Sequence, residues 1–273
     1  MKYISLIAIF FVVIKSVYSQ ESSVTETTIA ETNEYSLYAK KFGNLPVTIQ
    51  RSDLDDTSRN RSIPIIMYHP KIADSLKGKM KVVVLSHGYG FNSGKPYLGY
   101  SFIANHLASK GYFVVSVQHE VPTDDSLALD GPNLKELRMP NWEKGVKNIA
   151  YVIKSIQSEF DFVDTTGITL IGHSNGGDMS LLYAEKYPQN VVKIITLDNR
   201  RMPIPRTEKP MILSIRSSDQ IPDEGVIPSI EECEKYKISI ANMSNMLHND
   251  MCNNASAEQK ADMLYIIDEF IKK

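Results

Sequence analysis

A serine flanked by glycines stands between an apolar run and a helical pattern. Residues 172–176 read Gly-His-Ser-Asn-Gly, which fits the pattern G-x-S-x-G. The branched apolar run at 168–171 predicts a buried strand before it, and residues 178–184 predict a helix after it. A strand-to-helix turn this tight strains the central residue and requires neighbours without side chains, which explains the two glycines. The turn would present the Ser174 hydroxyl at the carboxyl edge of the sheet, as a nucleophile.

The chain also supplies partners that a nucleophilic serine needs. A serine hydroxyl attacks at neutral pH only if an imidazole accepts its proton, and that imidazole needs a carboxylate to fix its tautomer. His248 lies in a loop after the last predicted strand, which makes it the candidate base. Asp219 is preferred as the acid because it follows the strand predicted at 211–215, and Asp198, at the end of the preceding strand, is the alternative.

Strand-like and helix-like segments alternate along the rest of the chain. Strands are predicted at residues 45–49, 62–68, 81–85, 112–117, 168–171, 191–197, 211–215 and 237–241, the first two as a hairpin-like pair. Helices are predicted at residues 97–110, 141–160, 178–187, 229–236 and 258–271. This alternation predicts an α/β fold with a mostly parallel sheet and helices on both faces. In such sheets, function gathers in the loops that leave the carboxyl ends of the strands.

Composition narrows the classes of partner. The chain has 273 residues, 42% of them hydrophobic, and a net charge of −2, which suits one globular domain and gives no footprint for nucleic acid or an anionic membrane. Beyond the N-terminus no segment is apolar enough to cross a bilayer, so no stable membrane insertion is expected. The histidines and cysteines lack metal-ligand spacing and no phosphate-cradling glycine loop is present, so neither metal nor cofactor is expected.

The N-terminus resembles an export signal. Residues 1–19 contain a basic start, a short apolar run and small residues at the usual cleavage positions, which predicts a cleaved signal peptide and a secreted or periplasmic protein. An uncleaved anchor is the alternative. Residues 20–40, rich in Thr, Ser and Glu, are interpreted as a flexible linker, and 41–273 as a single catalytic domain.

Export would permit covalent modifications that the sequence leaves open. Cys233 and Cys252 could form a disulfide or remain free thiols, since a bridge demands a specific geometry. Asn60, Asn242 and Asn254 begin N-x-S acceptor patterns for glycosylation, which matter only if the host secretes through an endoplasmic reticulum.

Four motifs together resemble a known family. They are Ser-His-Gly-Tyr-Gly at 86–90, Gly-His-Ser-Asn-Gly-Gly at 172–177, Ser-Ser-Asp at 217–219 and Leu-His-Asn-Asp at 247–250. In this order they resemble the α/β-hydrolase superfamily, and within it the small secreted esterases related to platelet-activating-factor acetylhydrolases and dienelactone-hydrolase-like enzymes. The segment 61–70 is similar to the early strand of that group. The resemblance covers the chain from about Leu45 to its C-terminus.

The resemblance implies roles for individual residues. Ser174 would be the nucleophile, Asp219 the acid and His248 the base. The backbone N–H groups of Tyr89 and Asn175 would form the oxyanion hole. Hydrolysis of a carboxylic ester is therefore expected. A serine peptidase or a lipase on the same fold is an alternative, and a non-catalytic binding protein on a hydrolase scaffold is another.

The lengths of two loops indicate what size of substrate the site would accept. Residues 199–209 are too few for a large cap domain, and 120–140 is the only insertion long enough to cover the site, so small or polymer-borne esters are favoured over long lipid chains. Oligomeric state does not follow from the sequence.

Three arginines (Arg200, Arg201 and Arg206) follow the strand that ends at Asp198. They would attract an anionic substrate or simply lie in a solvated loop. His87 and His173 are interpreted as structural parts of their motifs, and His119 as a pocket-lining or satisfied histidine.

Overall fold

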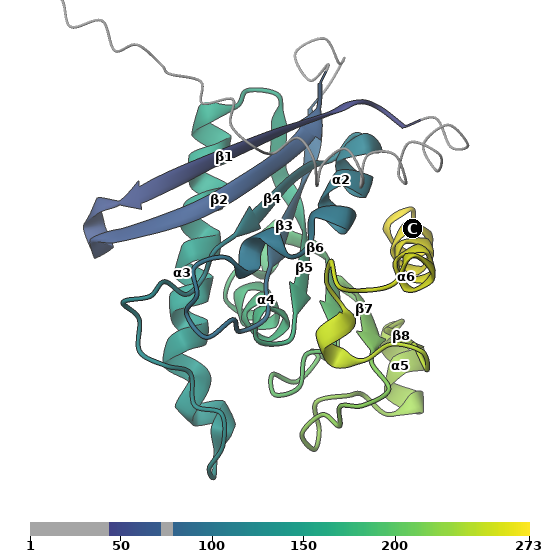
Figure 1. Cartoon of the computed structure of the whole chain (residues 1–273). Coiled ribbons are helices and arrows are strands. Elements are labelled where there is room, and N and C mark those ends of the chain that lie inside the picture. The colour runs from purple at the N-terminus through teal and green to yellow at the C-terminus, as the bar shows by residue number, and fades with distance from the viewer. Residues whose placement is uncertain (1–43, 72–78) are drawn as a thin grey trace, which may run out of the picture. The chain divides into compact units, whose positions relative to one another are not determined.

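An eight-stranded sheet forms the centre of the protein in a computed structural model that describes residues 44–71 and 79–273 (Figure 1). The strand order is β1-β2-β4-β3-β5-β6-β7-β8. The first two strands, β1 (Val47–Asp56) and β2 (Arg61–Pro70), pair antiparallel, and β2 pairs antiparallel with β4. The remaining pairs are all parallel. The expected hairpin and mostly parallel sheet are thus confirmed.

Strands and helices alternate from the third strand onward. The further strands are β3 (Met80–Ser86), β4 (Phe113–Val117), β5 (Val163–His173), β6 (Val191–Leu197), β7 (Met211–Arg216) and β8 (Ser239–Asn242). The helices are α2 (Ser101–Ser109), α3 (Leu134–Glu159), α4 (Asn175–Lys186), α5 (Ile230–Tyr236) and α6 (Ala257–Ile271). Short 3₁₀ turns lie at Thr57–Arg59, Pro96–Leu98, Pro188–Asn190 and His248–Asp250. Residues Leu45–Lys273 form one compact unit; the predicted signal peptide and linker lie outside the described residues.

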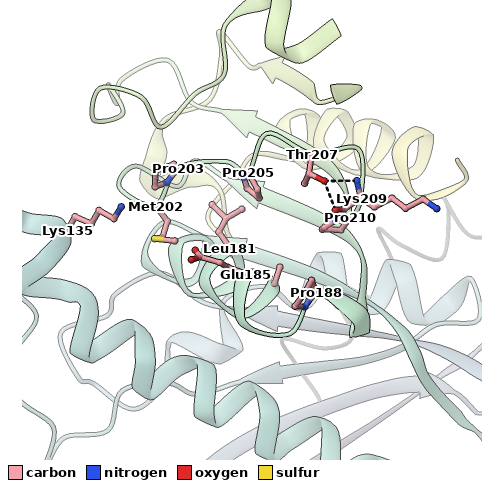
Figure 2. Close-up of a pocket in the computed structure, with 11 residues that line it drawn as sticks. Lys135, Leu181, Glu185, Pro188, Met202, Pro203, Pro205, Thr207, Lys209 and Pro210 are labelled. Carbon is pink, nitrogen blue, oxygen red and sulfur yellow. Dashed lines mark hydrogen bonds between the residues drawn. The ribbon is translucent and has the colours of Figure 1, made fainter. Parts of the chain in front are cut away.

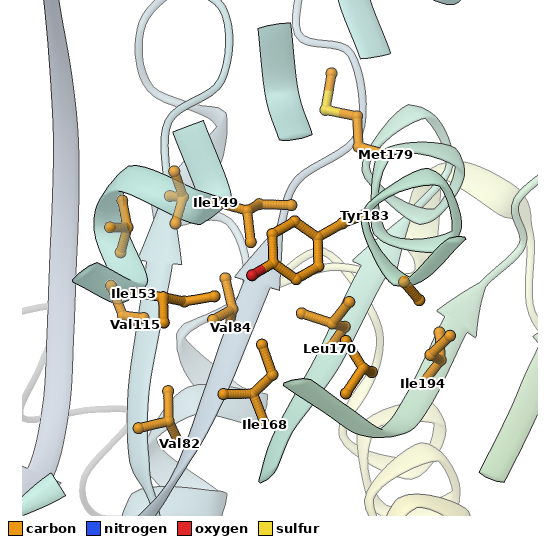
Figure 3. Close-up of a cluster of buried hydrophobic side chains, with 14 of the residues drawn as sticks. Val82, Val84, Val115, Ile149, Ile153, Ile168, Leu170, Met179, Tyr183 and Ile194 are labelled. Atoms are coloured by element: carbon orange, nitrogen blue, oxygen red, sulfur yellow. The ribbon is translucent and has the colours of Figure 1, made fainter. Parts of the chain in front are cut away.

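The helices cover both faces of the sheet. On one face α3 and α4 pack against each other, while α2 contacts α6 and the strands β2 and β4. Because side chains alternate along a strand, Val82 and Val84 of β3 join the cluster beneath α3 and α4, where Tyr183 and Ile149 meet the sheet (Figure 3). Burial of each large apolar side chain in this cluster contributes about 1.5–3 kcal/mol. The sheet is therefore fixed from both sides, and its carboxyl edge is a rigid base for loops.

The helix α3 begins earlier than predicted. The sequence predicts a helix over 141–160, but α3 begins at Leu134 and includes Pro140, although a proline disfavours the helical conformation of the residue before it. The extra turns are held by Arg138, whose side chain is buried and donates from Nε to the Ala128 carbonyl (2.8 Å). Tertiary contacts thus outweigh the local cost of the proline. Part of the insertion at 120–140 is consequently helix.

Candidate active site

Ser174 occupies the strained turn that the sequence predicts. It follows β5 directly, precedes α4, and has φ 50° and ψ −120°, a conformation rarely adopted by residues other than glycine. A Cβ on Gly172 would lie 2.3 Å from the Gly176 carbonyl oxygen, and one on Gly176 would lie 2.4 Å from the Ser86 carbonyl oxygen. Both glycines are therefore required by close backbone approach. The turn leaves Ser174 only partly buried, at the first residue beyond the strand.

A chain of hydrogen bonds links Ser174 to His248 and Asp198. Ser174 Oγ lies 3.0 Å from His248 Nε2, and His248 Nδ1 lies 2.5 Å from Asp198 Oδ2. Because a carboxylate only accepts, Nδ1 carries the proton and Nε2 is free to accept from the serine hydroxyl. The structure thus brings together the predicted nucleophile and base. Their carboxylate partner is Asp198, not the preferred Asp219.

The sheet register explains why Asp198 is the partner. β6 is the immediate neighbour of β5, with Leu197 paired to His173, so the residues after these two strands, Asp198 and Ser174, emerge side by side. The Ser174 N–H donates to the Leu197 carbonyl (2.8 Å), which ties the two turns together. Asp219 leaves β7, one strand further away. Asp198 is thus the first residue after the strand next to the nucleophile's strand, an adjacency that chain order alone does not give.

Asp198 is fully buried and remains ionised. Burial alone raises the pKa of this carboxyl, but the hydrogen bond from His248, the Arg216 guanidinium and the Ser217 hydroxyl and N–H outweigh it and hold the pKa below its usual range. Arg216 Nη2 lies 2.9 Å from Oδ1, and Ser217 Oγ lies 2.7 Å from Oδ2. Arg216 and Ser217 were not predicted to be part of the site. An ionised carboxylate suits the task of orienting His248.

Asp219 holds the backbone of His248 instead of its ring. The carboxylate is exposed and its Oδ1 accepts from the His248 N–H (2.7 Å). The same loop is tied to the His248 loop a second time, because the Ser218 N–H donates to the Met246 carbonyl (2.9 Å). The prediction that Asp219 contacts the imidazole is therefore wrong. Its place in the structure is that of an anchor for the loop.

His173 joins the His248 loop to the loop after β3. Its Nε2 lies 3.0 Å from the His248 carbonyl oxygen, so Nε2 carries the proton, and Nδ1 accepts from the Tyr100 hydroxyl (2.7 Å). The same hydroxyl accepts from the Gly88 N–H (3.1 Å). Burial, with the neighbouring His248, lowers the pKa of His173 to about 3, so the ring stays neutral. His173 is a structural part of its motif, as expected, and Tyr100 is a member that the sequence did not reveal.

The backbone of the loop after β3 passes close to Ser174. His87 Nε2 accepts from the His119 N–H (2.9 Å), so its Nδ1 donates to the Gly88 carbonyl (2.7 Å). In a trans peptide the next N–H points the opposite way, so the Tyr89 N–H faces away from the His87 ring. A Cβ on Gly88 would lie 3.3 Å from Ser174 Cβ, which shows how close this backbone comes to the serine.

Asn175 is the second residue expected to offer an N–H. It is the first residue of α4, where backbone N–H groups have no acceptor within the helix. Its buried side chain accepts from Trp142 Nε1 (2.7 Å) and donates to Glu120 Oε1 (3.0 Å) and Asn141 Oδ1 (2.9 Å). This network fixes the first turn of α4 relative to α3. His119, by contrast, is fully buried and does not line an open pocket.

Apolar side chains surround the carboxyl edge of the sheet. Large hydrophobic residues are exposed in the loops after β3, β4, β7 and β8 and in the first turn of α3: Phe91, Leu129, Ile221, Leu247 and, in α3, Leu137. A separate cavity of about 400 Å³ lies between the C-terminal half of α4 and residues 202–210 (Figure 2). Its lining includes Leu181, Pro205 and Pro210 but neither Ser174 nor His248. The reactive hydroxyl therefore opens toward the loops and not into this cavity.

Other predicted features can be placed as well. Cys233 and Cys252 are both free thiols. Within residues 44–71 and 79–273, no three His, Cys, Asp or Glu side chains are grouped so that they could hold a metal ion. In the same part of the chain, no helix combines the length and apolar character needed to cross a membrane.

The fold and the strained serine turn define a hydrolase scaffold, and comparison with known families agrees. Residues 81–217 match the family described as alpha/beta hydrolase fold. The chain belongs to this family. Among curated proteins no match was found.

Several solved structures share the fold at low sequence identity. A dienelactone hydrolase-like promiscuous phosphotriesterase from metagenomic libraries is 16% identical, with a TM-score of 0.57 over 82% of this chain and 98% of that chain. A fungal esterase from Rhizomucor miehei is 12% identical, with a TM-score of 0.56 over 88% of each chain. An α/β serine hydrolase without a lid from Xanthomonas campestris is 13% identical, with a TM-score of 0.56 over 84% of this chain and 96% of that chain. At this identity the likeness establishes the fold.

Proposed function

We propose that the protein is a serine hydrolase that cleaves carboxylic esters through an acyl-enzyme on Ser174. The observation that carries the proposal is the hydrogen-bonded chain from Asp198 through His248 to Ser174, built on a strained turn. The fungal esterase and the serine hydrolase without a lid that share the fold support the same class of reaction. Small or polymer-borne esters are the proposed substrates, and the N-terminal residues 1–19 support export.

The mechanism follows from the donors and acceptors. Ser174 Oγ attacks the acyl carbonyl carbon while His248 Nε2 accepts the hydroxyl proton, and Asp198 stabilises the resulting imidazolium. The backbone N–H groups of Tyr89 and Asn175 would stabilise the oxyanion, and removal of one such donor typically costs about 3 kcal/mol. Collapse of the intermediate expels the alcohol, which takes the proton from His248. Water, activated by the same imidazole, then hydrolyses the acyl-enzyme and regenerates Ser174.

Covalent labelling tests the proposal directly. A fluorophosphonate probe should label the full-length protein, and Ser174→Ala should abolish both labelling and hydrolysis of 4-nitrophenyl butyrate while the protein remains folded by circular dichroism. Ser158→Ala, which removes an exposed hydroxyl on α3, serves as the matched control and should retain both. Full ester turnover by Ser174→Ala would refute the assignment.

A further inference from the structure

Two buried arginines near the Ser174 edge of the sheet lack a carboxylate partner. Arg138 and Arg201 are each only 7% exposed. The arginines that form salt bridges in the described part of the chain are others, namely Arg59, Arg61, Arg206 and Arg216. Arg138 uses its Nε on the Ala128 carbonyl, and the Nε of Arg201 is buried without any acceptor. Neither guanidinium forms a salt bridge within the described residues.

Two carboxylates, Asp178 and Asp223, favour the charged forms of both arginines but form no salt bridge with either. Asp178 lies in the first turn of α4 and is buried, but its Oδ1 accepts from the backbone N–H groups of Arg201 (3.1 Å) and Met202 (2.8 Å). The Asn199 side chain lies at 3.4 Å from the same oxygen. Asp178 therefore shapes the loop that carries Arg201 and leaves its guanidinium unpaired.

Both arginines lie at the end of the sheet where Ser174 emerges. Arg201 follows Asp198 by three residues, and its backbone is bonded to the first turn of α4, which begins directly after Ser174. Arg138 lies one turn before Trp142 in α3, and the Trp142 indole donates to the Asn175 side chain. Burial, and then the charge of Arg201, lowers the pKa of Arg138 to about 10, so the two cations are close enough to repel each other.

Other arginines of the same loop are used differently. Arg206 bonds Glu232 and the carbonyls of Ile204 and Ile227, which makes it a structural residue. Arg200 donates to the Gln220 side chain. Unpaired buried cations are costly, whereas a planar guanidinium matches a carboxylate or phosphate with two parallel hydrogen bonds. The pair Arg138 and Arg201 is thus suited to an anion that arrives with the substrate.

We propose that Arg138 and Arg201 bind an oxyanion group, a carboxylate or a phosphate, carried by the ester that Ser174 cleaves. This inference rests on the proposed hydrolase function. The anion gives the two guanidinium groups the salt bridge that they lack in the folded chain, and the exposed apolar side chains of the surrounding loops contact the uncharged part of the substrate.

Matched ester pairs test the proposal. One pair places the charge on the acyl part: 4-nitrophenyl hydrogen glutarate against 4-nitrophenyl butyrate. A second pair places it on the alcohol part: acetoxyacetate against its methyl ester. Wild-type protein should show a higher kcat/KM for the charged member of at least one pair. Inhibition of 4-nitrophenyl butyrate hydrolysis by glutarate or by inorganic phosphate tells which anion is preferred.

Variants separate local recognition from overall charge. Arg201→Gln and Arg138→Gln should each lower the charged-to-neutral ratio of kcat/KM by ~10- to 100-fold, the usual worth of a hydrogen bond to a charged group. Lys154→Gln removes the same charge from an exposed position about 24 Å further along α3 and should leave the ratio within about twofold.

A binding measurement keeps the test independent of turnover. Calorimetric titration of Ser174→Ala with monomethyl glutarate and with inorganic phosphate should show binding to at least one, which the additional change Arg201→Gln weakens at least tenfold. If the neutral esters are cleaved but neither pair shows a preference that the arginine variants reduce, the anion site is refuted and the hydrolase stands. If no ester is cleaved and neither anion binds, both proposals fail; binding without cleavage would retain the anion site alone.

Discussion

Replacement of Asp198 by Asn would test the orientation of the catalytic imidazole. The Ser217 N–H donates to Oδ1 (3.2 Å) and the Arg216 guanidinium lies 2.9 Å from the same oxygen, so the amide oxygen of an asparagine would take that position. Its NH₂ group would then face His248 Nδ1. Since that nitrogen would have to accept, the imidazole proton would move to Nε2 and face Ser174. The serine would lose its proton acceptor while every side chain kept its place.

The expected loss is large because the wrong tautomer blocks the chemical step. Asp198→Asn should lower kcat for 4-nitrophenyl butyrate by about 10⁴-fold, which corresponds to about 5 kcal/mol of transition-state stabilisation. Fluorophosphonate labelling should slow in parallel, since it needs the same proton transfer. Circular dichroism and the thermal midpoint check that the variant is folded.

Asp219→Asn is the matched control. The remaining side-chain oxygen can still accept from the His248 N–H, and the position is exposed, so the loss in kcat should stay below about tenfold. A greater loss of kcat from Asp219→Asn than from Asp198→Asn would refute the assignment of Asp198 as the acid.

Three further perturbations probe the supports of the site. Tyr100→Phe removes the hydroxyl between Gly88 and His173, leaves both without a partner, and should lower kcat/KM about tenfold; an unchanged value would show that these bonds do not position the site. Burial and the neighbouring His248 lower the pKa of His173 from 6.5 to about 3. Between pH 6.5 and pH 3 the unfolded chain therefore binds more protons than the folded protein. The free energy of unfolding should fall as the pH drops through this window, by up to about 5 kcal/mol. His173→Gln should flatten the pH dependence of the urea midpoint, and an identical slope would contradict this. Gly172→Ala places a Cβ 2.3 Å from the Gly176 carbonyl oxygen and should destabilise the protein by about 3 kcal/mol in thermal unfolding; a wild-type midpoint would show that the turn adapts.

Much of the fold could be predicted because local patterns agree with the tertiary structure. The branched apolar runs became the parallel strands, and Val191–Leu197 was predicted with its observed bounds. The start of α3 differs from the prediction because a contact outside the helical pattern extends the helix. The bond from Arg138 to the Ala128 carbonyl stabilises the turns of α3 before residue 141.

The site was predictable where function depends on the adjacent backbone, and less so where it depends on strand order. The glycines around Ser174 are required by close backbone contacts within the turn, so the local sequence is enough to indicate the turn. The choice between Asp198 and Asp219 depends on which strand pairs with β5, and chain order does not give that adjacency. The roles of Tyr100 and Trp142 were hidden for the same reason, since their partners lie far away along the chain.

The bond from His173 to the His248 carbonyl has a consequence for how the protein could vary. His248 lies on a loop near the C-terminus, but its distance from the sheet is fixed by His173, the last residue of β5, which directly precedes Ser174. Insertions or deletions elsewhere in that loop would therefore leave the distance between Ser174 and His248 unchanged as long as this contact and the bond from the His248 N–H to Asp219 survive. Loop length can drift while the reactive pair keeps its spacing.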